Sequence, residues 1–144
     1  MSAAAATRAQ VIAAARAWLG VRWQHQGRSR AGVDCAGLVI AVAQGLGLTE
    51  FDTADYARHP DGVTLAATCE AQMRRIKRDA MQPGDVVLMR FDGHPQHLAL
   101  LAGYPLGGLS VVHAYAPARK VVEHRLDSVW RAHIVRAYSL PGVA

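Results

Sequence analysis

Apolar residues recur at two different spacings along this chain, and the spacing changes once. In the first half they return every three or four positions, as Val11, Ile12, Ala15 and Leu19 do, which is the spacing of one helical face. After the turn at residues 82–85 the pattern changes to short runs rich in valine and leucine, which are typical of strands. Helices followed by an antiparallel sheet predict the α+β class.

Three helices are predicted in the first half. Thr7 is a residue that can cap the first helix, and Gly20 is placed to end it. A basic run closes the third helix, where positive charge complements the negative end of a helix. The stretches between the helices have no period and predict loops. The predicted helices span about residues 7–20, 35–44 and 64–77, and the loops span 21–32 and 51–61.

Five strands are predicted in the second half, and a sheet of five to six antiparallel strands would hold them. Their expected bounds are residues 86–91, 97–102, 109–114, 120–125 and 132–138. No internal repeat, low-complexity tract or interdomain linker interrupts the pattern. The whole chain, residues 1–144, is therefore predicted to be one domain, which at this length can bury an apolar core without disulfides or metals.

The net charge limits the classes of binding partner but does not identify one. A net charge of +5 favours an anionic partner, which includes nucleic acid, a membrane surface and a cell wall rich in carboxylates. The basic run at 74–78 has no aromatic residue to stack on a base, so we expect no nucleic-acid site there. We also expect no membrane span. The first eight residues lack the pattern of a secretion signal, so synthesis in the bacterial cytoplasm without a signal peptide is expected.

Cys35 is the strongest candidate for chemistry. It follows Asp34 and opens an apolar helix, and the partial positive charge of a helix N-terminus should favour its thiolate and lower its pKa. The second cysteine, Cys69, lies within a predicted helix and is expected to be a passive packed residue. Both thiols are expected to be free, because no multi-cysteine framework is present.

Two histidines on predicted strands can complete a thiol site. Taken singly, His97 or His113 would more often be a satisfied core residue. Together with Cys35 they offer a nucleophile, a general base and a residue that orients the base. His94 and His97, preceded by Asp92, could instead be metal ligands, with Cys35 and His113 completing a zinc sphere. A loop histidine three residues before a strand histidine faces elsewhere, which disfavours this alternative. We therefore expect no metal and no cofactor.

Other residues have both a functional and a structural interpretation. Trp18 and Trp130 are expected to be packing aromatics rather than platforms for sugars. Arginines in the loop before Cys35 could clamp carboxylates or could simply be solvated, and the sequence favours neither interpretation. These arginines are Arg22, Arg28 and Arg30. Three further histidines are expected at solvated or edge positions: His59, His124 and His133.

Three motifs follow one another along the chain: DCAGLV at 34–39, PGDVV at 83–87 and HLALL at 97–101. They resemble the Asp-Cys-Ser-Gly-Leu-Val segment, the Pro-Gly-Asp turn and the His-Val-Gly-Ile-Tyr segment of the NlpC family of cell-wall cysteine peptidases. The resemblance covers nearly the whole chain and implies a papain-like α+β fold acting on peptidoglycan. It implies Cys35 as nucleophile, His97 as general base and His113 as the orienting residue.

The chain departs from this family upstream of the nucleophile. Trp23 stands where the family commonly has a tyrosine, and the double glycine often found after that tyrosine is missing. An indole donates a hydrogen bond but cannot exchange a proton as a phenol does. Substrate-binding candidates in this region are Trp23, Gln24, Gln26 and Asp34, while the backbone N–H of Cys35 is the expected oxyanion donor.

Smaller details resemble the bacteriophage-tail and gene-transfer-agent branch of the family. They are HQ at 25–26, HAY at 113–115, VVE at 121–123 and WR at 130–131. This resemblance implies a tail-tip component, with tail or hub proteins as partners, that cuts a D-γ-glutamyl-diamino acid bond of peptidoglycan. The enzyme would reach the wall after incorporation in a particle. The alternatives are a structural tail-hub subunit with weak or lost catalysis, and a thiol amidase or acyltransferase of the same fold.

Overall fold

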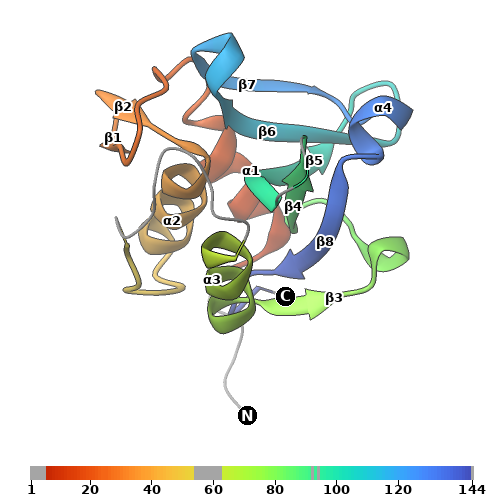
Figure 1. Ribbon diagram of the computed structural model, residues 1–144, viewed down its shortest axis with the longest axis horizontal. Helices are drawn as coiled ribbons and strands as arrows, with labels where there is room; N and C mark the ends of the chain where they lie inside the picture. Colours follow the sequence, from red (N-terminus) through yellow and green to blue (C-terminus); the bar gives the residue numbers. More distant parts are fainter. Residues whose placement is uncertain (1–5, 54–62, 92, 94, 144) are drawn as a thin grey trace.

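The computed structural model describes residues 6–53, 63–91, 93 and 95–143 of the chain. At its centre lies a six-stranded antiparallel sheet with the order β3-β8-β4-β5-β6-β7 (Figure 1). The strands are β3 (Arg74–Ile76), β4 (Val86–Arg90), β5 (Pro95–Gly103), β6 (Leu109–Tyr115), β7 (Lys120–Arg125) and β8 (Ile134–Ser139). Five of them match the five predicted strands within two residues at either end. The predicted α+β class is confirmed.

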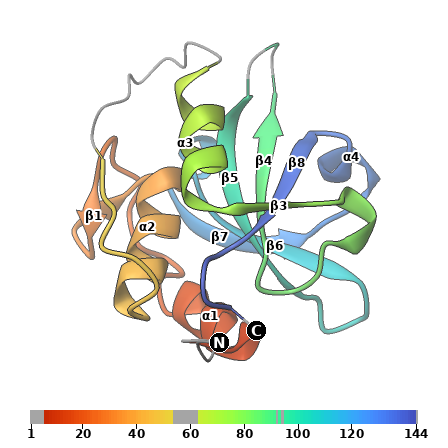
Figure 2. The same cartoon turned by 90° about the horizontal axis from the view of Figure 1, so that it is seen from below.

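Helices cover both sides of the sheet. Figure 2 shows α2 and α3 on one side and the short α4 on the other. The helices are α1 (Arg8–Arg16), α2 (Cys35–Gly45), α3 (Thr64–Gln72) and α4 (Ser128–Arg131), with 3-10 turns η1 (Arg78–Ala80) and η2 (Ala116–Ala118). The predicted loop before Cys35 contains a small hairpin of β1 (Arg28–Ser29) and β2 (Gly32–Val33).

The first helix begins as predicted and ends earlier. The Thr7 hydroxyl accepts the backbone N–H of Gln10, and the Gln10 side chain accepts the backbone N–H of Thr7, which is a capping box. The chain leaves the helix after Arg16 and turns toward Gly20, whose φ of 85° suits glycine. Trp18 lies in this turn and packs against the core, so its predicted packing role is confirmed.

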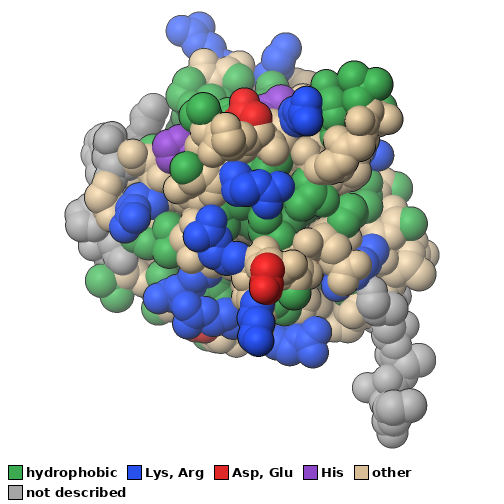
Figure 3. Space-filling view, turned by 90° about the vertical axis from the view of Figure 1, so that its right-hand side faces the viewer, with side chains coloured by type: hydrophobic (Ala, Val, Ile, Leu, Met, Phe, Trp, Pro, Cys, Tyr) green, Lys and Arg blue, Asp and Glu red, His purple; other side chains and the backbone are tan. Residues whose placement is uncertain are grey.

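The predicted end of the third helix is wrong. Helix α3 stops at Gln72, and the basic run enters the edge strand β3, where Arg74 pairs with Ser139 of β8. The backbone N–H and C=O groups of this run form hydrogen bonds with the edge of β8. The basic side chains therefore lie on an edge strand and not at a helix terminus. Figure 3 shows Lys and Arg side chains gathered on the side where β3, β8 and α4 lie. Residues 54–62 of the predicted loop at 51–61 lie outside the described residues.

Alternate residues of the strands face two separate cores. Leu88, Leu100 and Val112 pack toward the side of α2, and all three are at most 1% exposed. Val87 and Leu101 pack toward the opposite side, where α4 lies. This alternation follows the two-residue period of strands. A residue's position along a strand therefore decides which side of the sheet its side chain reaches.

The turn before β4 is fastened to the first helix. Asp85 is fully buried, accepts the backbone N–H of Gln82 at 2.9 Å, and pairs with Arg8 at 2.6 Å. Gly84 has a φ of 94°, a backbone conformation that a side chain would strain. The predicted Pro-Gly-Asp turn thus starts the central strand β4. Among the described residues, no helix has the length and hydrophobicity needed to cross a bilayer.

Candidate active site

Asp34 fixes the beginning of α2. Its carboxylate accepts the backbone N–H of Gly37 and, through the other oxygen, that of Gln26, each at 2.7 Å. The side chain is buried, so both bonds form away from water. Asp34 therefore holds the loop and the helix start together. A contact between Asp34 and substrate stays a prediction.

Gly37 lets the loop lie directly on α2. A Cβ at this position would lie 2.2 Å from the backbone oxygen of Gly27, closer than any real contact. A Cβ at Gly27 would likewise lie only 2.3 Å from the backbone oxygen of Gly32. The loop and the first turn of α2 are thus pressed together through glycines. This close packing fixes where Cys35, two residues before Gly37, presents its thiol.

The first turn of α2 lies where the sheet splits. The ladder between β5 and β6 ends at the pair Leu100–Val112, so the earlier part of β5 is not paired with the end of β6. The backbone of Leu98, in that earlier part, forms a hydrogen bond with the Cys35 sulfur. Because Leu98 follows His97 directly, the thiol of the candidate nucleophile lies one residue along the chain from the candidate base.

Two imidazole rings meet on the side of the sheet opposite to α2. Nε2 of His97 lies 2.6 Å from Nδ1 of His113, which is a hydrogen bond between the rings. The two rings are 6% and 0% exposed. The structure therefore brings His97 and His113 into contact with each other, and it places the Cys35 sulfur on the backbone of Leu98, next to His97 in the chain. Their catalytic roles stay predictions at this point.

Aromatic side chains enclose the two rings. Tyr115 stacks on His113 with 5.1 Å between ring centroids, and Trp130 meets His113 edge-on at 5.2 Å. Phe91 lies 5.4 Å from the His97 ring. Trp130 also packs against the core beneath α4, so its predicted packing role is confirmed. The enclosure keeps water from the imidazoles and lowers the local dielectric.

A third imidazole continues the pair, and sequence reasoning missed it. Nε2 of His124, on β7, lies 2.8 Å from Nε2 of His113, while Nδ1 of His124 lies 3.0 Å from the backbone oxygen of Arg125. His124 does lie on an edge strand, as expected, but its ring is turned toward the site. His133, expected to be similar, packs on Trp130 and bonds the backbone oxygen of Arg90.

Burial sets the protonation of the thiol and the base. Burial, reinforced by the Asp34 carboxylate, raises the pKa of Cys35 to about 11. Burial, with a smaller contribution from His124, lowers the pKa of His97 to about 3, and burial beside His97 lowers the pKa of His113 as well. The predicted low pKa of Cys35 is wrong, because desolvation of the sulfur outweighs the partial charge of the helix. At neutral pH both the thiol of Cys35 and the imidazole of His97 are therefore uncharged.

The loop before Cys35 approaches the sheet through its backbone. The Trp23 N–H donates to the backbone oxygen of Arg119, and the Gln24 N–H donates to that of Val33. Trp23 is half-buried against the core, whereas the side chains of Gln24 and Gln26 are exposed. Contacts of these three residues with substrate stay predictions.

The loop arginines have protein partners. Arg28 pairs with Asp34 at 3.4 Å and with Asp52 at 2.8 Å, and Arg30 lies over the Trp18 ring at 4.0 Å. The Arg22 side chain is exposed. Arg28 and Arg30 therefore contribute to holding the loop against the rest of the fold.

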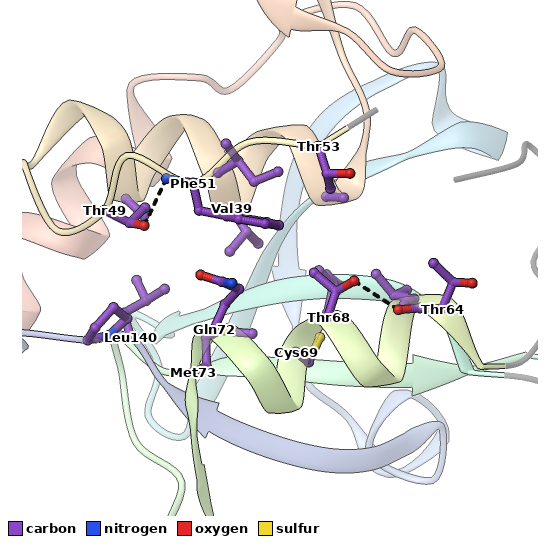
Figure 4. Close-up of a pocket in the computed structure, with 16 residues that line it drawn as sticks. Val39, Thr49, Phe51, Thr53, Thr64, Thr68, Cys69, Gln72, Met73 and Leu140 are labelled. Atoms are coloured by element: carbon purple, nitrogen blue, oxygen red, sulfur yellow. Dashed lines mark hydrogen bonds between the residues drawn. The ribbon is translucent and has the colours of Figure 1, made fainter. Parts of the chain in front are cut away.

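An apolar cavity lies beside the site, between α2 and α3 (Figure 4). Its lining includes Ala36 and Leu98, which follow Cys35 and His97 in the chain, and the buried Cys69. Cys69 points into this cavity, as Figure 4 shows, and both cysteines are free thiols. The predicted packed role of Cys69 agrees with its 2% exposure.

Among the residues described, no group of three or more histidine, cysteine or acidic side chains is arranged to hold a metal ion. Asp92 and His94 of the zinc alternative lie outside the described residues, as does His59.

Comparisons with known proteins agree with the fold. The model of the NlpC/P60 family matches residues 20–139. The NlpC/p60 domain of the peptidoglycan hydrolase SagA has a TM-score of 0.63 and 19% identity, covering 92% of this chain and 98% of that one. A family protein from Bacillus cereus scores 0.69 at 19% identity and covers 93% of this chain, which spans only 40% of that protein.

A third similar structure is named as an amidase. An N-acetylmuramoyl-L-alanine amidase from Bacteroides uniformis has a TM-score of 0.61 and 12% identity, covering 93% of this chain and 98% of that one. No curated protein matches the sequence. At these identities the solved structures support the papain-like fold.

Proposed function

Because the chain belongs to the NlpC/P60 family, whose members are cysteine peptidases or amidases on peptidoglycan, we propose that it hydrolyses peptidoglycan stem peptides with Cys35 as nucleophile. The observation that carries this proposal is the position of the Cys35 sulfur on the backbone of Leu98, where β5 and β6 separate, next to the residue whose ring is paired with His113. The excess of basic side chains suits a substrate rich in carboxylates.

The acylation step begins from neutral groups. As the sulfur of Cys35 attacks the peptide carbonyl, its proton passes to His97, which acts as general base. Nε2 of His97 is engaged with His113, so Nδ1 is the nitrogen that takes the proton. The thiol and the imidazole draw together when substrate binds, as catalytic hydrogen bonds commonly do. The backbone N–H of Cys35 stabilises the developing oxyanion, a contribution of about 3 kcal/mol.

The cycle then closes through a thioester. His97 returns the proton to the leaving amine, the C–N bond breaks, and the acyl group stays on the Cys35 sulfur. A water molecule gives a proton to His97 and attacks the thioester carbonyl. The C–S bond breaks, the thiol regains its proton from His97, and the stem peptide leaves with a new carboxylate.

The neutral resting pair predicts slow alkylation of Cys35 at neutral pH. Since its pKa is raised to about 11, the rate with iodoacetamide should increase about tenfold per pH unit from pH 7 to 10, in proportion to the thiolate. The rate is measured by mass spectrometry of the intact protein. The Cys35→Ala variant, which keeps only the buried Cys69, is the control. Fast labelling that is constant between pH 5 and 8 would show a resting thiolate–imidazolium pair instead.

The proposed bond joins the γ-carboxyl of D-glutamate to the diamino acid. We expect purified protein to cut muropeptides there, and mass spectrometry of the products to locate the cut. In water enriched in oxygen-18, hydrolysis places one heavy oxygen in the new D-glutamate carboxyl group. Release of the complete stem would assign an amidase instead, and transfer to an added amine without heavy oxygen would assign an acyltransferase.

We also propose that the enzyme is a component of a phage-like tail tip, where it opens the wall during penetration. The support is the resemblance of its smaller motifs to the phage-tail branch. Mass spectrometry of purified particles from the producing strain tests this proposal. The chain is expected in the tail fraction, and its presence only in unassembled fractions would contradict the particle role.

A further inference from the structure

Three imidazoles and a carbonyl form a continuous chain of hydrogen bonds. From the site outward it runs from His97 to His113 at 2.6 Å, to His124 at 2.8 Å, and to the backbone oxygen of Arg125 at 3.0 Å. The proposed mechanism uses only the first two rings. The third ring and the carbonyl therefore have no role assigned so far.

The sheet places the three rings on one side. In the ladder of β6 and β7, His113 lies opposite Val122, and Val111 lies opposite His124. Residues two apart on a strand share a face, so His113 and His124 are diagonal neighbours. Trp130 packs against both rings, with its centroid 5.2 Å from His113 and 4.6 Å from His124. Packing thus holds the rings in the orientation that joins their nitrogens.

The carbonyl at the end gives the chain a direction. A carbonyl oxygen only accepts hydrogen bonds, so Nδ1 of His124 carries a hydrogen and donates it to Arg125. In a neutral imidazole the other nitrogen is then an acceptor, so Nε2 of His124 accepts from Nε2–H of His113.

The direction of the hydrogen bonds continues through His113 to His97. Nδ1 of His113 is left as an acceptor, so it accepts from Nε2–H of His97. His97 therefore has its lone pair on Nδ1, the nitrogen that must take the proton of Cys35. This arrangement of hydrogens holds while the rings are neutral, and burial lowers the pKa of both His97 and His113.

We propose that His124 is a positioning residue that selects the reactive tautomer of His97. It acts through His113: because the Arg125 carbonyl accepts from His124, each ring in turn accepts from the next, and the hydrogen of His97 is held on Nε2. This inference rests on the proposed function, since it assumes that His97 takes the proton of the nucleophile. Without His124, the Nε2–H of His113 loses its acceptor, and the alternative tautomers of both rings become populated.

Two variants at one position test the proposal. His124→Leu removes both polar atoms, while His124→Gln keeps an oxygen that accepts from His113 and an amide that donates to Arg125. We expect the leucine variant to lose about 10- to 100-fold in kcat with KM unchanged, the range for partners that orient a functional histidine. The glutamine variant should stay within about threefold of the unmodified enzyme, because it restores both hydrogen bonds.

A measurement independent of turnover reads the tautomers directly. Long-range proton–nitrogen NMR spectra of the histidine rings show which nitrogen carries hydrogen. In the unmodified protein we expect hydrogen on Nε2 of both His97 and His113, and in His124→Leu a mixture of tautomers. His133→Leu is the matched control, because this ring also contacts Trp130 but lies outside the chain of rings. It should leave both kcat and the tautomers unchanged.

The outcomes separate this inference from the proposed function. Unchanged tautomers and turnover in a folded His124→Leu variant would overturn the inference, and so would hydrogen on Nδ1 of His97 in the unmodified protein. A glutamine variant as impaired as the leucine variant would also overturn it. If the unmodified protein cleaves no muropeptide, the proposed function fails, while the NMR spectra still decide the tautomer assignment.

Discussion

Replacing Cys35 with alanine is expected to reduce muropeptide cleavage by on the order of 10⁴-fold or more, because the attacking atom is removed. Cys35 lies at the first turn of α2, and the hydrogen bond that caps this turn comes from the Asp34 carboxylate rather than from the thiol. Alanine therefore leaves the fold in place. The rate is followed by chromatography of the products, and circular dichroism confirms that the variant is folded.

Cys69→Ala is the matched control for that experiment. Its thiol lines the cavity beside α3, away from the imidazole rings, and is not part of the proposed reaction. The change should cost about 1 kcal/mol of stability by enlarging the cavity and leave kcat unaltered. Cleavage that persists in Cys35→Ala and disappears in Cys69→Ala would show that Cys69, and not Cys35, is the nucleophile.

The second large effect is a loss of stability in mild acid. His97 and His113 have lowered pKa values in the folded protein, while the unfolded chain binds protons on these rings near the ordinary value of 6.5. Below that pH the unfolded state binds more protons, so acid favours unfolding. The contribution of these rings to the free energy of unfolding is fully present above pH 6.5. It decreases as the pH falls, until the pH reaches the folded pKa of His97, about 3.

The expected size follows from the two rings together. Between pH 7 and 4.5 each ring contributes a loss of about 2 to 3 kcal/mol, which makes ~5 kcal/mol for both and is a large part of the stability of a small domain. Urea unfolding at several pH values measures this loss. His113→Gln removes one of the two groups and should halve the pH dependence. A free energy of unfolding that stays constant over this range would contradict the assignment of two buried neutral rings.

Strand positions were predictable because each strand carries its own signal. The runs at Val86 and Leu109 follow turns that contain glycine, and their apolar residues are numerous enough to fill both cores. The bounds of β7 were predicted without error. By contrast, Arg74 and Arg75 have no strand signal. They join the sheet because the edge of β8 is available to them, which is information from the tertiary structure.

The site was predictable in part for a similar reason. Cys35 and His97 stand in local motifs, whereas His124 is a single polar residue on an edge strand. Its role depends on the register of β6 and β7, which pairs Val111 with His124 across the turn at η2. Counting outward from that turn would have placed His124 beside His113. The pKa of Cys35 was not predictable, since its burial depends on the folded neighbours rather than on the helix alone.

Because the site forms at the split between β5 and β6, hydrolysis requires that α2 is docked on the sheet. The Cys35 thiol comes with α2 from one face of the sheet and the imidazoles lie on the other, and the thiol reaches the backbone beside His97 where the ladder is open. A chain in which the sheet has formed but α2 has not docked would contain every reactive group and remain inert. In refolding experiments, recovery of hydrolysis would therefore trail the recovery of the sheet, and the interval between them would time the docking of the helix.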